Sequence, residues 1–90
     1  MAKTLNPKNV DVTDSATEII AASAARHEII ISNSISGSTV FISFEADPIV
    51  DKGVPLFAGE KMSFAGKHAQ MKISGICDTL GTATVLIQEI

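Results

Sequence analysis

The stretch 27–45 constrains the fold of this chain more than any other part of the sequence. Two runs of β-branched and aromatic residues flank a connection rich in serine and glycine. The run 40–45 alternates, with Val, Ile and Phe at its even positions, so one face of a strand would enter a core. The run 29–31 is three contiguous isoleucines, which is typical of a strand covered on both faces. The stretch therefore predicts a β-hairpin at the centre of an all-β domain.

Short strands separated by turn residues are also predicted over the rest of the chain. Alternating runs lie at 9–13, 60–65, 70–74 and 82–89. Prolines and glycines mark 46–55 as a surface loop, and 75–81 is predicted as a turn region. This gives seven or eight short strands at a spacing of about ten residues, with no crossover helices between them. The pattern predicts a single antiparallel β-sandwich.

The segment 15–26 allows two interpretations. Ser15 and Glu18 have the spacing of a helical capping box, and several alanines favour a helix. The alternation over 17–22 favours a strand instead, followed by a loop over 23–26. We prefer the strand and keep the helix as the alternative.

The alternating positions also define the expected core. The sequence has no Trp or Tyr and four Phe, so this core must be largely aliphatic. We expect it to contain Val10, Val12, Ile29, Ile31, Val40, Ile42, Phe44, Phe64, Ile73, Val85 and Ile87.

Length, charge and cysteine content exclude several classes of protein. At 90 residues the chain forms one domain, which we place at 9–90 after a polar N-terminal arm at 1–8. The net charge is −3 and the lysines are scattered, which argues against binding of nucleic acid. One cysteine allows no intrachain disulfide. No apolar run approaches the length of a membrane span, so we expect no membrane contact and folding in a cytoplasm.

Residue types that could bind metal are present but poorly arranged. A blue-copper site needs two histidines, a cysteine and a methionine close together, and no histidine follows the cysteine here. The residues considered for it are His27, His68, Cys77, Met62 and Met71. Calcium could be bound by Glu45, Asp47 and Asp51, but Pro48 and two apolar residues interrupt that set. We expect no metal, and expect the methionines and the cysteine to fill the core.

No catalytic motif is present. The sequence lacks the Gly-x-Ser-x-Gly turn of many hydrolases, and a domain this small leaves little room for a substrate cleft. We therefore expect no catalytic residue, no cofactor and no enzyme activity. A small hydrolase is the least favoured class, and a small ligand-binding sandwich ranks above it.

A second set of apolar residues should point away from the core. Several such residues on one outer sheet would form a patch large enough to need a partner. The residues expected in this oligomer interface are Ile20, Ile30, Phe41, Ile76 and Leu86. They predict a closed homo-oligomer, with a dimer as one possible state.

Several segments, taken in order, resemble small virion proteins of tailed bacteriophages. The quoted segments are Val-Asp-Val-Thr at 10–13, Ala-Thr-Glu-Ile-Ile-Ala-Ala at 16–22, Arg-His-Glu-Ile-Ile-Ile-Ser-Asn at 26–33, Thr-Val-Phe-Ile-Ser-Phe at 39–44, Gly-Val-Pro-Leu-Phe-Ala-Gly-Glu at 53–60 and Gly-Thr-Ala-Thr-Val-Leu-Ile-Gln-Glu at 81–89. The resemblance spans nearly the whole domain. It consists of strand-like and turn-like segments in the same order, without a chemical motif.

The resemblance implies a β-sandwich of jelly-roll type and a structural, non-enzymatic role in the virion. Within that group it favours a decoration or cement protein that binds the major capsid protein or another virion protein. A tail or fibre module is the alternative. The resemblance also favours a trimer over a dimer, and implies synthesis in the cytoplasm of the host bacterium followed by residence in the virion.

Overall fold

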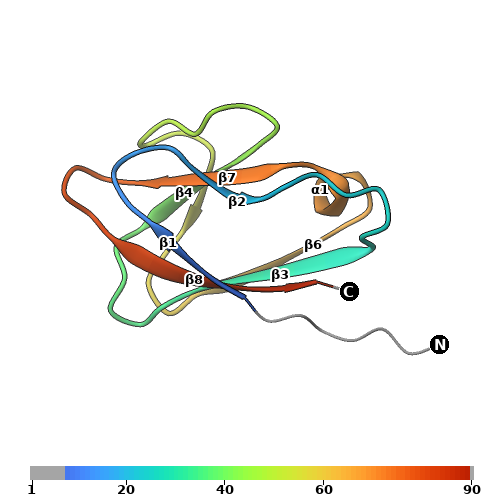
Figure 1. The fold of residues 1–90 in the computed structure, drawn as a ribbon. Coiled ribbons are helices and arrows are strands. Elements are labelled where there is room, and N and C mark those ends of the chain that lie inside the picture. Colours follow the sequence, from blue (N-terminus) through green and yellow to red (C-terminus); the bar gives the residue numbers. More distant parts are fainter. Residues whose placement is uncertain (1–7, 90) are drawn as a thin grey trace.

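Residues 8–89 are the part of the chain that the computed structural model describes, and they form two four-stranded antiparallel sheets (Figure 1). The first sheet has the order β1-β8-β3-β6, built from β1 (Lys8–Val12), β8 (Ala83–Glu89), β3 (Glu28–Asn33) and β6 (Lys61–Ala65). The second has the order β2-β7-β4-β5, built from β2 (Thr17–Ile20), β7 (Ile73–Cys77), β4 (Val40–Phe44) and β5 (Val54–Leu56). The predicted all-β antiparallel sandwich is confirmed.

The strands pair in a nested order. β1 pairs with β8, β2 with β7, β3 with β6 and β4 with β5, all antiparallel. The pairs β3·β8 and β4·β7 then complete the two sheets. The pairs β1·β8 and β3·β6 lie in the first sheet, and the pairs β2·β7 and β4·β5 lie in the second. The chain is thus arranged like one long antiparallel ribbon that passes back and forth between the two sheets.

The predicted central hairpin is wrong. β3 lies in the first sheet and β4 in the second, so the two strands do not pair with each other. The connection 34–39 leads from the first sheet to the second, and the backbone N–H of Ser38 in it donates to the carbonyl of Thr82 at 2.9 Å. Hairpin loops are usually two to five residues long, whereas this six-residue connection is long enough to cross the roughly 10 Å between packed sheets.

Two further boundaries differ from the sequence-based expectation, and one ambiguity is resolved. Residues 17–20 are a strand, as preferred over the helix. The short helix α1 (Lys67–Gln70) was not expected; it includes Gln70, the first residue of the predicted strand 70–74, and β7 begins only at Ile73. No helix within residues 8–89 is long and apolar enough to cross a membrane. The predicted arm ends earlier than expected, because Lys8 is the first residue of β1, and its other residues lie outside the described part.

The predicted turn at 75–81 is also partly wrong, because β7 continues to Cys77. Gly75 lies in a buried position of this strand and not in a turn. A Cβ added there would lie 2.8 Å from Val40 Cγ1 and 2.9 Å from Ile19 Cδ1. The glycine is therefore required by close packing against side chains of β4 and β2, the neighbouring strands of its own sheet.

The core lies between the sheets and is aliphatic, as expected. Buried as predicted are Val12, Ile29, Ile31, Val40, Ile42, Ile73, Val85 and Ile87. Val10, Phe44 and Phe64 are only partly buried against this core. The buried residues also include Ile19, Leu56, Ala69, Cys77 and Ala83.

Phe44 is incompletely covered because its neighbour strand is short. β5 begins at Val54, which lies opposite Ile42, so no β5 residue reaches the level of Phe44. The Phe44 ring instead packs edge-to-face on Phe64, with centroids 5.0 Å apart and planes at 78°. The two rings therefore close the side of the sandwich that lies beyond the start of β5.

Candidate interaction surfaces

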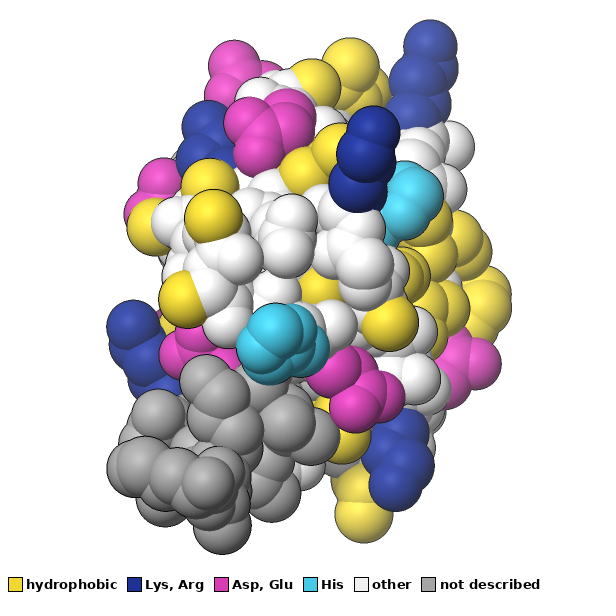
Figure 2. Space-filling view, turned by 90° about the vertical axis from the view of Figure 1, so that its right-hand side faces the viewer, with side chains coloured by type: hydrophobic (Ala, Val, Ile, Leu, Met, Phe, Trp, Pro, Cys, Tyr) yellow, Lys and Arg dark blue, Asp and Glu magenta, His cyan; other side chains and the backbone are white. Residues whose placement is uncertain are grey.

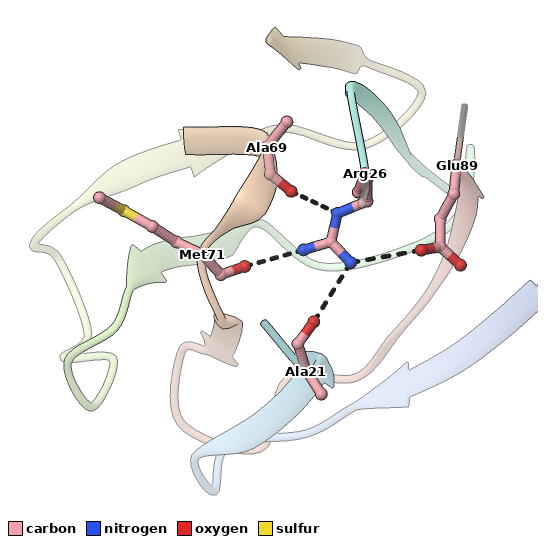
Figure 3. Close-up of polar contacts among 5 residues, drawn as sticks. All are labelled: Ala21, Arg26, Ala69, Met71 and Glu89. Atoms are coloured by element: carbon pink, nitrogen blue, oxygen red, sulfur yellow. Dashed lines mark hydrogen bonds and ion pairs between the residues drawn. The ribbon is translucent and has the colours of Figure 1, made fainter. Parts of the chain in front are cut away.

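The most highly connected polar side chain is Arg26, which is 4% exposed (Figure 3). Its Nε donates to the Ala69 carbonyl, Nη1 to the Ala21 carbonyl at 3.1 Å, and Nη2 to the Met71 carbonyl at 2.9 Å. Nη1 also contacts Glu89 Oε1 at 3.2 Å. One guanidinium thus joins the end of β2, the α1 region and the end of β8. Its donors are engaged within the fold, so we assign it a structural role.

A second polar contact organises the other end of the sandwich. Asn33 Nδ2 donates to the carbonyls of Ser38 at 2.8 Å and Leu56 at 3.0 Å. This amide links the end of β3 to the connection 34–39 and to β5. It fixes the point at which the chain leaves the first sheet.

Four loops meet at that end, which lies at the left of Figure 1 and which we call the loop end; it comprises residues 13–16, 34–39, 57–60 and 78–82. Hydrogen bonds join these loops to one another. The Gly59 N–H donates to the Ser34 carbonyl at 3.0 Å, and the Leu80 N–H donates to Asp14 Oδ2 at 3.1 Å. The loop end is therefore one connected surface. It lies opposite the end at which β1 begins and β8 finishes.

Among residues 8–89, the loop end carries three of the four large apolar residues that are most exposed. Ile35 is 90% exposed, Leu80 88% and Phe57 54%, whereas the fourth, Ile49 at 57%, belongs to the connection between β4 and β5. Leu56, the residue before Phe57, is buried in the core, whereas the Phe57 side chain is exposed. None of these loop residues was predicted as an interface residue, because no periodic pattern marks them.

Leu80 is unusual in its backbone as well as its exposure. Its φ is 61°, in the left-handed region that glycine, asparagine and aspartate adopt most readily. It lies in a turn in which the Gly81 N–H donates to the Asp78 carbonyl at 2.7 Å. Neither the turn nor the core gives a reason for leucine at this position.

Carboxylates surround these apolar side chains. Asp11, Asp14, Glu60 and Asp78 are all exposed at or next to the loop end, against one exposed cation, Lys61. The opposite end differs: Figure 2 shows lysine or arginine, acidic, histidine and hydrophobic side chains intermixed there. The loop end is therefore an apolar surface with an acidic rim.

A shallow hollow of about 390 Å³ adjoins this surface. Hydroxyl-bearing side chains dominate its lining, and Thr84 Oγ1 donates to Asp11 Oδ1 at 3.0 Å across it. The lining residues that carry polar side chains are Asp11, Thr13, Ser34, Ser36, Thr82 and Thr84. The hollow was not predicted from the sequence, because its residues come from separate loops and strands.

Cys77 lies buried beneath the acidic rim, as a core residue. Burial raises the pKa of its thiol above the ordinary value of 9.0, and the nearby carboxylates of Asp78 and Asp14 raise this pKa further. The folded protein therefore holds the thiol proton more tightly than the unfolded chain does.

This pKa difference predicts how stability depends on pH. Stability from the protonated thiol is fully present below the unfolded pKa of about 9.0 and is lost as pH rises through the folded value, with a slope of at most about 1.4 kcal/mol per pH unit. Denaturant melts at a series of alkaline pH values measure this loss. In Cys77→Ala the slope should be shallower than in wild type; equal slopes would contradict the assignment.

The predicted interface residues are all half-buried, but they divide between two opposite faces. Ile30 and Leu86 lie on strands of the first sheet, and Phe41 and Ile76 lie directly opposite each other on β4 and β7 of the second. Ile20 also belongs to the second sheet, where it packs partly against the core. The five residues therefore do not form one continuous patch.

The residues considered for metal binding are engaged elsewhere or lie apart. The His68 ring packs on Phe44 with centroids 5.0 Å apart, and Glu45 Oε2 accepts the Lys72 N–H at 2.7 Å. Within the described part of the chain, no three His, Cys, Asp or Glu side chains are grouped so that they could hold an ion.

Comparison with known proteins gives no relative. No protein-family model matches the chain, and neither the curated proteins nor the solved structures contain a detectable match.

Proposed function

We propose that the chain is a structural protein of a tailed-phage virion, and within that class a decoration or cement protein that binds and stabilises the head shell. A tail or fibre module is the alternative position in the virion. The observation that carries the proposal is the nested pairing of eight strands in two four-stranded sheets. This pairing supports a jelly-roll assignment, an architecture used by viral capsid proteins.

Fold alone does not assign a function, so two further features matter. Six segments that span most of the domain, from Val10 to Glu89, resemble those of small virion proteins of tailed bacteriophages. The exposed apolar residues Ile35 and Leu80 are also of the kind that marks protein-binding surfaces. Both features favour a protein that acts by binding other proteins.

Co-sedimentation with phage heads assembled without this chain tests the proposal. The purified protein should pellet with the heads and saturate at a fixed number of copies per particle. Binding to tails but not heads would favour the tail or fibre module. A protein that pellets with neither particle would overturn the proposed function.

We also propose that the protein assembles as a homo-oligomer, with a trimer favoured over a dimer. The outer face of the second sheet is the better candidate for the subunit interface. On it, Ile76, Phe41 and Pro55 form one apolar row across β7, β4 and β5. The corresponding outer face of the first sheet places Leu86 between the polar residues Asn9 and Ser32.

Phe41→Asp is expected to convert the oligomer to monomers while the sandwich stays folded, because a carboxylate would be buried without a partner in the assembled interface. Sedimentation velocity at micromolar concentration and circular dichroism measure the two effects. Leu86→Asp is the matched control on the other face and should leave the assembly intact. A monomeric wild type, or dispersal by the control alone, would contradict the assignment.

A small ligand-binding sandwich is the second candidate, favoured by the hydroxyl-lined hollow beside the loop end. Its polar groups suit a small hydroxylated ligand such as a sugar. Titration with monosaccharides, followed by amide chemical shifts, tests it. Saturable shifts confined to the hollow and abolished in Thr84→Val would favour this candidate over the virion role.

A further inference from the structure

We propose that the loop end is the surface by which this protein docks on the virion shell, and that the shell protein there has apolar recesses rimmed by lysine or arginine side chains. The inference rests on the proposed function and adds which surface binds and what chemistry receives it. The exposed apolar side chains of this surface are those of Ile35, Leu80 and Phe57.

Leu80 combines an unfavourable backbone conformation with nearly full exposure. A leucine in the left-handed region is strained, and at 88% exposure it gains little from burial in this fold. Positions that break local rules without an evident structural gain are expected at functional sites. Burial of this side chain in a partner would supply the missing gain.

Ile35 projects from a loop whose position is fixed by hydrogen bonds. Ile35 projects at 90% exposure from the connection 34–39, which is held by the Asn33 amide and by the hydrogen bond from Ser38 to Thr82. The neighbouring turn at Gly59 donates to Ser34. The loops at this end are therefore fixed to one another before binding, which lowers the entropy lost on docking.

The charge of the loop end indicates the charge of the partner. Four carboxylates and one lysine surround the apolar side chains, so a favourable contact surface must be basic around its recesses. The carboxylates Asp14 and Asp78 are close enough to the buried Cys77 to raise the pKa of its thiol, which agrees with a negative local potential. The same rim would be repelled by an anionic bilayer, which favours a protein over a lipid surface.

The test compares variants in binding to heads assembled without this chain. Ile35→Asp and Leu80→Asp should each raise the Kd at least tenfold, because each places a carboxylate in an apolar recess. Ile49→Asp is the matched control, an exposed apolar residue outside the loop end. It should stay within twofold of wild type, and thermal melts should show all three variants folded.

Binding measured at two salt concentrations and with lipid vesicles distinguishes docking on a basic protein surface from binding to a membrane. Raising NaCl from about 50 mM to about 500 mM should weaken wild-type binding to heads, since exposed opposite charges are screened. Neutral phosphatidylcholine vesicles and anionic phosphatidylglycerol vesicles should not bind. Vesicle binding that the two loop-end variants abolish would overturn the inference in favour of a membrane.

The outcomes distinguish this inference from the proposed function. If wild type fails to bind any virion particle, the proposed function fails and this inference fails with it. If wild type binds and the loop-end variants bind equally well, only the inference fails.

Leu80→Asn provides a second readout that a purely structural role would not give. Asparagine tolerates the left-handed region, so this variant should raise Tm by about 4 °C. The same variant should weaken binding to heads at least fivefold. Higher stability with undiminished binding would show that the leucine is not a docking residue.

Discussion

Replacing Arg26 with alanine is expected to lower the free energy of unfolding by about 3–5 kcal/mol, as measured by denaturant titration. The change removes the donor for three carbonyl groups, those of Ala21, Ala69 and Met71. Two of these carbonyls belong to the α1 region and the third follows β2, so the guanidinium joins two segments that are remote in the sequence. Native proteins have a stability of about 5–15 kcal/mol, so a loss of this size removes a large share of the total.

Two controls separate the buried hydrogen bonds from the ion pair. Glu89→Gln keeps all three carbonyl contacts and changes one partly exposed ionic contact, so it should cost no more than about 1 kcal/mol. Arg26→Lys retains the charge but cannot supply the same fork of donors, and should fall between the other variants. If Arg26→Ala and Glu89→Gln cost the same, the carbonyl contacts contribute little.

The sequence predicted the class of fold and most of the core because both depend on local periodicity. Alternation at 40–44 and 83–89 placed Ile42, Val85 and Ile87 inward, and these residues are buried. The short turn-separated runs predicted a sandwich, and two packed antiparallel sheets are found. Each of these inferences needs only the two-residue period of a strand.

Pairing between strands could not be predicted in the same way. The three isoleucines at 29–31 predicted a strand covered on both faces, but burial alternates along β3 and Ile30 is only half-buried on the outer face. The pattern also does not identify β8 and β6 as the neighbours of β3. Adjacency in the sequence favours β4 instead, which is why the six-residue connection was predicted to be a hairpin turn. The choice between pairing and crossing depends on contacts such as Ser38 to Thr82, which are remote in the sequence.

The candidate surface was the least predictable feature. Periodicity finds apolar residues on strands, so it selected Ile30 and Phe41, whose side chains are half-buried on opposite sheets. Ile35 and Leu80 lie in loops, where no period exists, and their neighbourhood is created by the topology. Arg26 was missed for the same reason, because its acceptors come from segments brought together only by the fold.

The packing between the sheets gives the second large effect. Ile31→Ala is expected to lower the free energy of unfolding by about 2–5 kcal/mol, because Ile31 is fully buried in the central region of the first sheet. It lies opposite Ile87 on β8 and Met62 on β6, so truncation leaves a cavity bordered by both strands. Urea titration of wild type and variant measures the difference.

Matched substitutions test both the magnitude and the register. Ile31→Val removes one methyl group and should cost about 0.5–1.5 kcal/mol, whereas Ile35→Ala, in an exposed loop, should stay within about 0.5 kcal/mol of wild type. Ile30→Ala should cost less than Ile31→Ala, since Ile30 points away from the core. A slip of one residue in the pairing of β3 would reverse that order, because it would exchange the faces of every side chain on the strand. A larger loss from Ile30→Ala than from Ile31→Ala would therefore show that the register of β3 is wrong.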